Sequence, residues 1–503
     1  MDHPLGAVSA RPRVGKVLVC LLVAGLVITA AVATFELTRV EDEEPPRPLA
    51  VPSEIVGPDP LAFDDARRSA YERAAAFGLS HVLFAKSPGG VVASARRTAD
   101  FRPLVEEAVA GSGIDPDLLE AIVFLESAGR PDVIAGHDVE HAAGLVQILA
   151  ETATNFLGMP VDLAASRQLT KRIDEARRRG DADAVDAQLA ERRGVDARFD
   201  PSQALAGAVR YLTEARDRFG REDLAVVSYH MGIGNLEGVL RAYSGRSNGS
   251  IETVVDEEDL DYVRVYFDSS PGRNRGAWER LYSFGDDSQT YYWRVLAARE
   301  IMGLFRKRPA ELERLSELHG RGPSAELVLH PPDATPRFAE PDDLEQALAR
   351  GDLRKIPDDP ERHHFRIGPG IGREGARSGE DSAAYPTLRP RAIRLLRYLA
   401  AQVYELSGET TPLTVTRVAS DEASAGSLPK STPDRATHAS IHATGYSFDV
   451  RRRYGSGTQA EAFQWTLERL GALGLIAWSR DDALIHVTVS PKADVRPPTS
   501  ASR

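Results

Sequence analysis

The sequence contains a single cysteine, Cys20, among its 503 residues. One thiol cannot form an internal disulfide or supply the sulfur ligands of a cysteine-based zinc site. An excess of basic residues is also missing, since the formal net charge is −12 at pH 7. This charge argues against a general nucleic-acid-binding protein. The hydrophobic content of 42% is typical of globular proteins, and the length is sufficient for two or three domains.

One long uncharged segment lies near the N-terminus. Residues 17–35, VLVCLLVAGLVITAAVATF, carry no charge and are long enough to cross a bilayer as a helix. Basic residues precede this segment and acidic residues follow it, so we expect a cytoplasmic N-terminus at 1–15 and a single-pass cell-membrane anchor at 16–36. The remainder would be extracytoplasmic. The alternative is a secretory signal that is cleaved near Ala33.

The composition changes several times after the anchor. The patterns predict six further segments: a proline-rich acidic linker at 37–60, a mainly α domain at 61–245, a helical extension at 246–325, a linker at 326–387, a small α+β domain at 388–491 and a tail at 492–503. The fold class is therefore multi-domain. A highly charged run at 161–198 is most simply a solvated helical hairpin.

A glutamate interrupts the apolar pattern of IDPDLLEAIVFLESAGRPDV. Asp115 can cap a helix here, and Gly129 can end it. The helical period places Glu126 on the same face as three apolar residues, Leu119, Ile122 and Val123. Apolar neighbours raise the pKa of a carboxyl group, so that it holds a proton near neutrality, as a general acid must. The alternative is a glutamate at the edge of the stripe that reaches solvent.

Two further motifs follow Glu126-Ser127 in the chain: Gly144-Leu145-Val146-Gln147, and Ser228-Tyr229-His230-Met231-Gly232-Ile233-Gly234. Over roughly residues 101–245 this order resembles lytic transglycosylases of the soluble-lytic-transglycosylase (SLT) type, which have a lysozyme-like fold. Their pattern is Glu-Ser, then Gly-Leu-x-Gln, then Ala-Tyr-Asn-x-Gly-x-Gly. This chain departs from it at His230 and Ser228, and the charged hairpin is an insertion.

The resemblance implies a reaction that needs one carboxyl group and no cofactor. Glu126 would protonate the glycosidic oxygen between N-acetylmuramic acid and N-acetylglucosamine, and then accept the proton of the C6 hydroxyl as a 1,6-anhydro ring closes. Tyr229 would position and polarise the glutamate or the acetamido group. The resemblance assigns substrate binding to Ser127, Gly144, Gln147 and Gly232.

A second group of motifs lies near the C-terminus. ATHASIHATGYSFDV places His442 and Asp449 seven residues apart, and ALIHVTVS adds His486. Two histidines and one aspartate can hold zinc and leave a position for water. The spacing Ser440-x-His442-x-x-Gly445-x-Ser447-x-Asp449 resembles the signature of zinc D-Ala-D-Ala peptidases (the M15 group) over about residues 388–491. The resemblance makes these three residues metal ligands.

The peptidase pattern is incomplete in this chain. The family has its catalytic acid three residues before the last histidine, where this chain has Ala483. Asp482 is the candidate peptidase base if the turn permits. We therefore expect a zinc-dependent peptidase or a domain that only binds peptidoglycan stem peptides.

Both resemblances indicate the same polymer. The leading hypothesis is a membrane-anchored peptidoglycan lytic transglycosylase that cleaves glycan strands, with a C-terminal domain that trims or binds stem peptides. The alternative is a non-catalytic cell-wall-binding scaffold that keeps both folds. A hydrolase of the lysozyme or chitinase type would need a second carboxylate, for which Glu151 and Asp200 are candidates.

Overall fold

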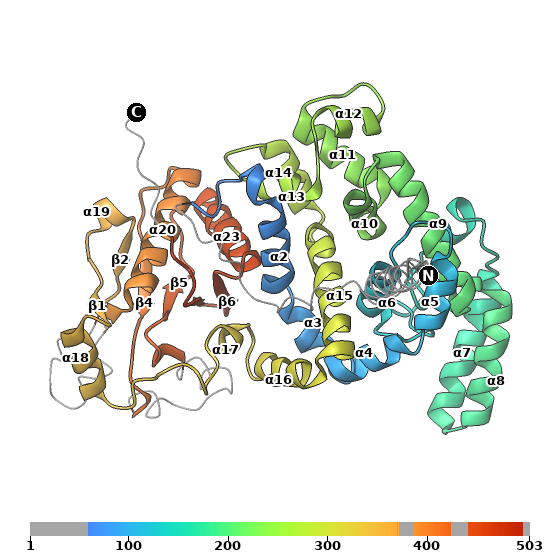
Figure 1. Ribbon diagram of the computed structural model, residues 1–503, viewed down its shortest axis with the longest axis horizontal. Coiled ribbons are helices and arrows are strands. Elements are labelled where there is room, and N and C mark those ends of the chain that lie inside the picture. Colours follow the sequence, from blue (N-terminus) through green and yellow to red (C-terminus); the bar gives the residue numbers. More distant parts are fainter. Residues whose placement is uncertain (1–58, 370, 372–385, 424–440, 496–503) are drawn as a thin grey trace, which may run out of the picture. The chain divides into compact units, whose positions relative to one another are not determined.

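The computed structural model describes residues 59–369, 371, 386–423 and 441–495 (Figure 1). The expected anchor at 16–36, the alternative cleavage site and most of the linker at 37–60 lie outside these residues. Within the described ranges, no helix is both long enough and apolar enough to span a bilayer. All described residues belong to one compact unit.

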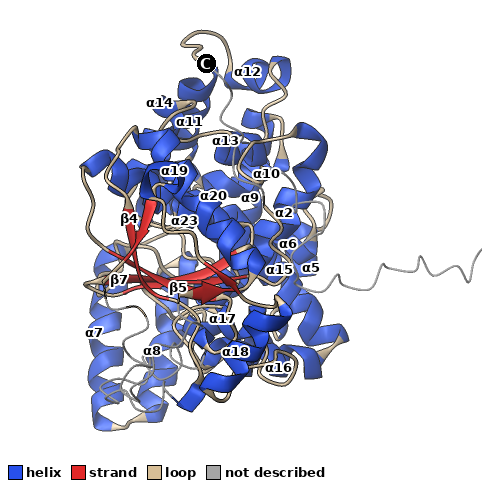
Figure 2. Cartoon of the chain, turned by 90° about the vertical axis from the view of Figure 1, so that its left-hand side faces the viewer, coloured by secondary structure: helices blue, strands red, loops and turns tan. Residues whose placement is uncertain are grey.

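Helices form the first part of the chain (Figure 2). Up to residue 244 the elements are η2 (Asp65–Arg67), α2 (Arg68–Gly78), α3 (His81–Lys86), α4 (Val91–Ala99), α5 (Arg102–Val109), α6 (Pro116–Ser127), η3 (Thr152–Phe156), α7 (Leu163–Arg179), α8 (Ala182–Val195), η4 (Ala197–Phe199), α9 (Pro201–Phe219), α10 (Glu222–Met231) and α11 (Ile233–Ser244). They are followed by α12 (Ile251–Glu257), α13 (Tyr262–Phe267), α14 (Arg275–Ser283), η5 (Ser288–Thr290), α15 (Tyr291–Lys307) and α16 (Pro309–Gly320).

Helix α6, which carries Glu126, has the ends that its sequence predicts. The Asp115 side chain accepts a hydrogen bond from the backbone N–H of Asp117 and so caps the first turn. Ala128 and Gly129 then adopt left-handed backbone angles, with φ of 53° and 71°. At Gly129 a Cβ atom would lie 2.5 Å from the backbone of Arg97, so only glycine permits this close approach of α4.

The charged run forms a helical hairpin of α7 and α8. Asp162 and Asp181 cap the two helices, and Gly180, with φ of 73°, ends the first one. Leu169 and Ile173 are buried on one side of α7, while most charged side chains of the hairpin are exposed. The amphipathic pattern therefore decides which face packs against the rest of the protein.

The expected helical extension packs into the same core as the preceding helices. Helix α15 contacts α6, α2, α4 and α10. Trp293 on α15 is fully buried, with its ring 5.6 to 5.7 Å from the rings of Tyr262, Tyr266 and Phe267 on α13. Aromatic side chains bury large apolar areas, so this cluster joins the extension to the helices that carry the motifs.

A mixed five-stranded sheet forms the C-terminal part, in the order β2-β4-β5-β7-β6. The strands are β2 (Phe365–Ile367), β4 (Leu413–Arg417), β5 (Ser447–Arg451), β6 (Ile476–Arg480) and β7 (Leu484–Val489). Only β2 and β4 pair in parallel. Helices α20 (Pro390–Ser407) and α23 (Gly457–Ala472) pack against each other beside the sheet, which gives the expected α+β architecture.

The stretch at 326–387 differs from the linker that we expected. Its described residues form α17 (Glu326–Leu329), α18 (Pro341–Arg350), β1 (Arg354–Lys355), α19 (Pro360–His363), β2 and the start of β3 (Thr387–Leu388). Strand β2 is an edge strand of the sheet, and its Phe365 is fully buried. Such short elements are set by their tertiary partners, since two or three residues show no detectable periodicity.

The helices and the C-terminal part are in direct contact. The Trp465 indole N–H on α23 donates a hydrogen bond to the Ser269 carbonyl at 3.1 Å. The buried Arg469 guanidinium lies 3.6 Å from the centre of the Tyr266 ring. At Gly78 on α2, a Cβ atom would lie 2.3 Å from the carbonyl oxygen of Ala472, so the two helices touch through their backbones.

Candidate active site and candidate metal centre

Glu126 lies in the last turn of α6, where its Oε1 accepts a hydrogen bond from the Tyr291 hydroxyl at 2.7 Å. Burial raises the pKa of Glu126 to about 7; the Tyr291 hydrogen bond and the charge of Arg294 oppose the rise, and the charge of Asp287 adds to it. Glu126 is nevertheless not fully buried and remains partly exposed to solvent. The carboxyl group can therefore hold a proton near neutrality and still meet a substrate, as a general acid must.

Tyr291 is a residue that the sequence motifs did not identify. It is the first residue of α15 and is almost fully buried. It stands 165 positions from Glu126 in the chain, within a segment for which the sequence suggested no chemistry. The α6–α15 packing alone brings the two side chains together.

Tyr229 makes a different contact from the one expected of it. Its hydroxyl donates a hydrogen bond to the Val146 carbonyl at 2.9 Å, and its ring meets the Tyr211 ring edge-on at 5.2 Å. Burial raises the pKa of Tyr229, and the charge of Glu126 adds to the rise. Tyr229 thus ties the third motif to the second, and its direct role toward the glutamate or the substrate stays a prediction.

His230 packs against Tyr291. Their rings are stacked, with centres 5.0 Å apart. The His230 Nδ1 atom lies 2.9 Å from the Ser288 hydroxyl, and its Nε2 atom lies 3.6 Å from Asp287, which in turn pairs with Arg294. Burial lowers the pKa of His230. The histidine that departs from the family pattern therefore packs against the tyrosine that binds Glu126.

The side chains of Ser127 and Gln147 form hydrogen bonds with backbone groups of the protein. The Ser127 hydroxyl donates to the Val123 carbonyl at 3.2 Å and accepts from the Arg130 N–H at 3.3 Å. Gln147 has a φ of 50°, and its side-chain amide donates to the carbonyls of Val133 and Gly144 at 3.1 and 2.8 Å. The Ser127 bonds hold the backbone at the end of α6, and the Gln147 bonds hold the loop that contains the Gly-Leu-x-Gln motif. Sugar binding by the two residues stays a prediction.

The two motif glycines sit where other residues would be strained. Gly144 has a φ of 83°, and a Cβ atom there would lie 1.8 Å from the Arg198 carbonyl oxygen. Gly232 has a φ of 87° and joins α10 to α11. Both glycines allow a turn beside the motif residues, and a direct role in substrate binding stays a prediction.

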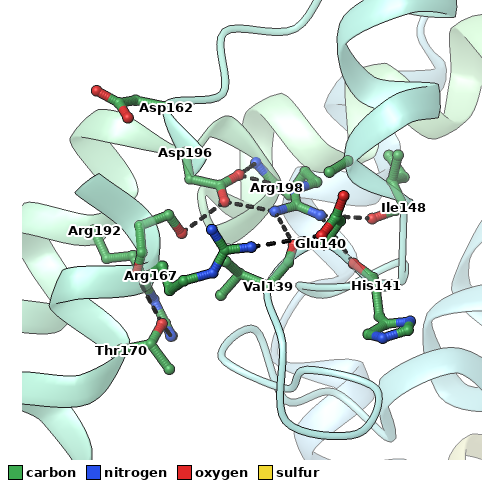
Figure 3. Close-up of polar contacts among 12 residues, drawn as sticks. Val139, Glu140, His141, Ile148, Asp162, Arg167, Thr170, Arg192, Asp196 and Arg198 are labelled. Atoms are coloured by element: carbon green, nitrogen blue, oxygen red, sulfur yellow. Dashed lines mark hydrogen bonds and ion pairs between the residues drawn. The ribbon is translucent and has the colours of Figure 1, made fainter. Parts of the chain in front are cut away.

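A buried ion pair joins the base of the hairpin to the Gly-Leu-x-Gln loop (Figure 3). The side chains of Arg198 and Asp196 are both fully buried, and the Arg198 Nη2 atom lies 2.7 Å from Asp196 Oδ2. The Arg198 guanidinium also donates to the carbonyls of Val139 and His141 at 2.6 and 3.0 Å. Because a buried charge is costly unless it is paired and hydrogen-bonded, these contacts fix the loop to η4. The sequence motifs did not single out Arg198.

The two carboxylates that we considered as the second catalytic group of a hydrolase, Glu151 and Asp200, form no hydrogen bond with Glu126. Asp200 caps α9 by accepting a hydrogen bond from the Gln203 N–H at 2.9 Å. Glu151 is exposed just before η3. Neither is among the groups that perturb the pKa of Glu126, whereas Asp287 is.

The three predicted zinc ligands lie together in the C-terminal part. One potential ligand atom from each of His442, Asp449 and His486 lies within 4.8 Å of the others, and all three residues are buried. Asp449 on β5 pairs in register with His486 on β7. The alternation of the two strands therefore directs both side chains to the same face of the sheet.

The hydrogen bonds of His442 direct its Nε2 atom toward Asp449. Its Nδ1 atom lies 2.9 Å from the Val418 carbonyl, which can only accept, so this nitrogen carries the proton. Burial lowers the pKa of His442 to about 4, and the ring is neutral. The unprotonated Nε2 atom then faces Asp449 Oδ1 at 3.2 Å. His₂Asp is a donor set that zinc accepts, so these three residues could hold an ion.

Asp482 lies in the turn between β6 and β7 and is not one of the clustered residues. Its side chain is exposed, and the turn is held by Asp481, which accepts from the N–H groups of Ala483 and Leu484. A buried carboxylate outside the predicted ligand set, Glu326 on α17, has its Oε2 atom 3.1 Å from His486 Nε2. The role of Asp482 as a peptidase base stays a prediction.

The first described part of the chain is mainly helical, and it carries the three motifs around Glu126, Gly144 and Tyr229. A family model described as the transglycosylase SLT domain matches residues 181–249, which include Tyr229, His230 and Gly232. Glu126 precedes the matched residues. No curated protein matches the chain. The family match supports a peptidoglycan lytic transglycosylase, in agreement with the sequence prediction.

Proposed function

We propose that this protein is a peptidoglycan lytic transglycosylase in which Glu126 acts as both general acid and general base. The observation that carries the proposal is the Glu126 carboxyl group, which is desolvated, bound by Tyr291 and partly accessible. Its pKa of about 7 leaves both protonation states populated at neutral pH. A scaffold protein has no need of a carboxyl group in this state.

In the proposed reaction the protonated Glu126 donates its proton to the glycosidic oxygen, and the bond to C1 of N-acetylmuramic acid breaks. The acetamido group of the same sugar stabilises the positive charge that develops at C1. The Glu126 carboxylate then removes the proton of the C6 hydroxyl, O6 bonds to C1, and the acid is regenerated. No water is consumed, so the product is a 1,6-anhydro sugar.

Tyr291 stabilises Glu126 in the part of the reaction in which Glu126 is a carboxylate. When Glu126 has given up its proton, the Tyr291 O–H donates to a carboxylate rather than to a neutral acid, and the hydrogen bond strengthens. An interaction that strengthens as charge develops lowers the barrier and not only the energy of the bound substrate. His230 holds the tyrosine ring in place through the stacked contact.

The identity of the product tests this proposal. We would incubate the full-length protein with purified peptidoglycan in water enriched in ¹⁸O and analyse the released fragments by mass spectrometry. Fragments that end in 1,6-anhydro-muramic acid, one water lighter and free of ¹⁸O, are expected. Reducing ends that contain ¹⁸O would mean hydrolysis, and the absence of glycan cleavage would favour the scaffold.

We also propose that the chain acts at the cell membrane, with its bulk outside the cytoplasm. The uncharged run at 17–35, with basic residues before it and acidic residues after it, supports this placement. Retention in the membrane fraction after alkaline extraction is expected. Release of a chain whose N-terminus begins near residue 34 would instead support a cleaved signal.

The His442–Asp449–His486 cluster favours a second function. We propose that these residues hold a zinc ion and that the C-terminal part trims or binds stem peptides. When bound, such an ion would polarise a carbonyl group and activate water. Elemental analysis should find about one zinc per chain in the wild type and a strong loss in Asp449→Asn; equal zinc contents in the two proteins would exclude this site.

A further inference from the structure

The two ring nitrogens of His486 face two different buried carboxylates. Nδ1 lies 2.7 Å from Asp449 Oδ1, and Nε2 lies 3.1 Å from Glu326 Oε2. Glu326 is fully buried and is the first residue of α17, outside the strands that carry the cluster. Burial of a carboxylate is unfavourable unless a partner compensates for the lost water, and His486 is such a partner.

His442 shows the same pattern. Its Nε2 atom faces Asp449, while its Nδ1 atom is held by the Val418 carbonyl. Each histidine thus directs one nitrogen toward Asp449 and has an acceptor at the other. Histidines that bind metals usually donate their second N–H to a carboxylate or a carbonyl, which fixes the tautomer and the ring orientation.

We propose that Glu326 is the positioning residue of the metal centre. It accepts the Nε2–H of His486, so that the Nδ1 lone pair is directed toward an ion shared with His442 and Asp449. This inference rests on the proposed zinc site. The imidazole ring separates Glu326 from the Asp449 side, so Glu326 is an outer partner and not a fourth ligand. An ion held by these three residues would have a fourth position for water or substrate.

Thr488 provides a matched comparison at the same nitrogen. Its hydroxyl oxygen lies 3.1 Å from His486 Nε2 and 2.8 Å from the Ser447 hydroxyl. A neutral hydroxyl is a weaker acceptor than a carboxylate and does not raise the basicity of the ring to the same extent. If the charge of Glu326 matters, its removal should weaken zinc binding much more than the removal of the Thr488 hydroxyl.

The test measures the zinc affinity of the full-length protein by competition with a chromophoric chelator. Glu326→Gln keeps the size of the side chain and should raise the zinc Kd by about 10- to 100-fold, the range for such outer partners. Thr488→Val should change the Kd by less than about threefold, since it removes only a neutral acceptor. An unchanged Kd in Glu326→Gln would overturn the inference.

A spectroscopic readout separates positioning from a merely structural role. In zinc-loaded wild-type protein with ¹⁵N-labelled histidine, NMR should show His486 with a proton on Nε2 and none on Nδ1. A proton on Nδ1, or Nε2 bound to the metal, would overturn the inference. Glu326→Asp should recover part of the affinity, and the wild-type spectrum remains decisive if a variant does not fold.

Failure of the inference can be distinguished from failure of the zinc site. Zinc binding by the wild type that is lost in Asp449→Asn but unchanged in Glu326→Gln would overturn only the role of Glu326. A folded wild-type protein that binds no zinc, or an Asp449→Asn variant that binds as well as the wild type, would overturn both proposals.

Discussion

Replacement of Tyr291 by phenylalanine removes a single hydroxyl group from the candidate active site. In the wild type this hydroxyl donates to Glu126 Oε1 at 2.7 Å. A hydrogen bond to a charged group contributes about 1.5–3 kcal/mol, and one pKa unit corresponds to about 1.4 kcal/mol. The hydrogen bond stabilises the carboxylate form. Its loss should therefore raise the pKa of Glu126 from about 7 to between about 8 and 9.

Two consequences for catalysis follow from this change. Below pH 7 the glutamate is protonated in both proteins, but the carboxylate that forms during bond cleavage is less stable in the variant. The rate should fall by about 10- to 100-fold, because each 1.4 kcal/mol corresponds to a factor of ten. The acid form persists to higher pH when its pKa is raised, so the alkaline limb of the pH–rate profile should move up by about one to two pH units.

The assay measures the initial rate of muropeptide release from purified peptidoglycan between pH 5 and pH 10. Tyr292→Phe is the matched control, because the neighbouring Tyr292 hydroxyl donates to Glu72 at 3.0 Å and not to Glu126. The control should keep the wild-type profile. A Tyr291→Phe enzyme with an unshifted alkaline limb and a wild-type rate would refute the reasoning.

Three further predictions concern stability. Gly144→Ala should lower the free energy of unfolding in urea by more than about 3 kcal/mol, because it adds backbone strain and a severe clash. Gly136 has open space around it, so Gly136→Ala should lower the free energy of unfolding only by the strain of its positive φ. Arg198→Ala should lower the free energy of unfolding by about 3–5 kcal/mol, because it leaves a buried carboxylate unpaired. Arg167 belongs to an exposed ion pair, so Arg167→Ala should leave the urea midpoint nearly unchanged. Because the pKa of Glu126 is raised in the folded protein, the wild type loses stability as the pH rises from about 4.5 to about 7. At pH 8, Glu126→Gln should therefore be up to about 3 kcal/mol more stable than the wild type. At pH 4.5 the variant should have no such advantage. Equal stabilities at pH 8 would contradict this last prediction.

Some features of the fold and sites follow from patterns within a few residues of the chain. The Asp115 cap and the left-handed residues after Ser127 define α6, and both are local signals. The metal cluster also has a local basis. His442 and Asp449 are close in sequence, and the alternation around Asp449 and His486 predicts strands that direct both side chains to one face.

Other features depend on packing between distant segments. Tyr291 begins an apolar helix, and only the contact of α15 with α6 brings its hydroxyl to Glu126. Glu326 falls at the start of the stretch that we expected to be a linker, yet tertiary contacts bury it beside His486. Strands β2 and β6 were not expected, because β2 has only three residues and β6 shows no clear alternation.

The most direct test of the central claim compares wild-type protein with Glu126→Gln on the same peptidoglycan. Glutamine keeps the shape of the side chain but can neither donate an acidic proton nor act as a base. Fragments that end in 1,6-anhydro-muramic acid should be released by the wild type and be absent with the variant, while Glu151→Gln should act as the wild type does. Release of anhydro fragments by Glu126→Gln at the wild-type rate would contradict the account.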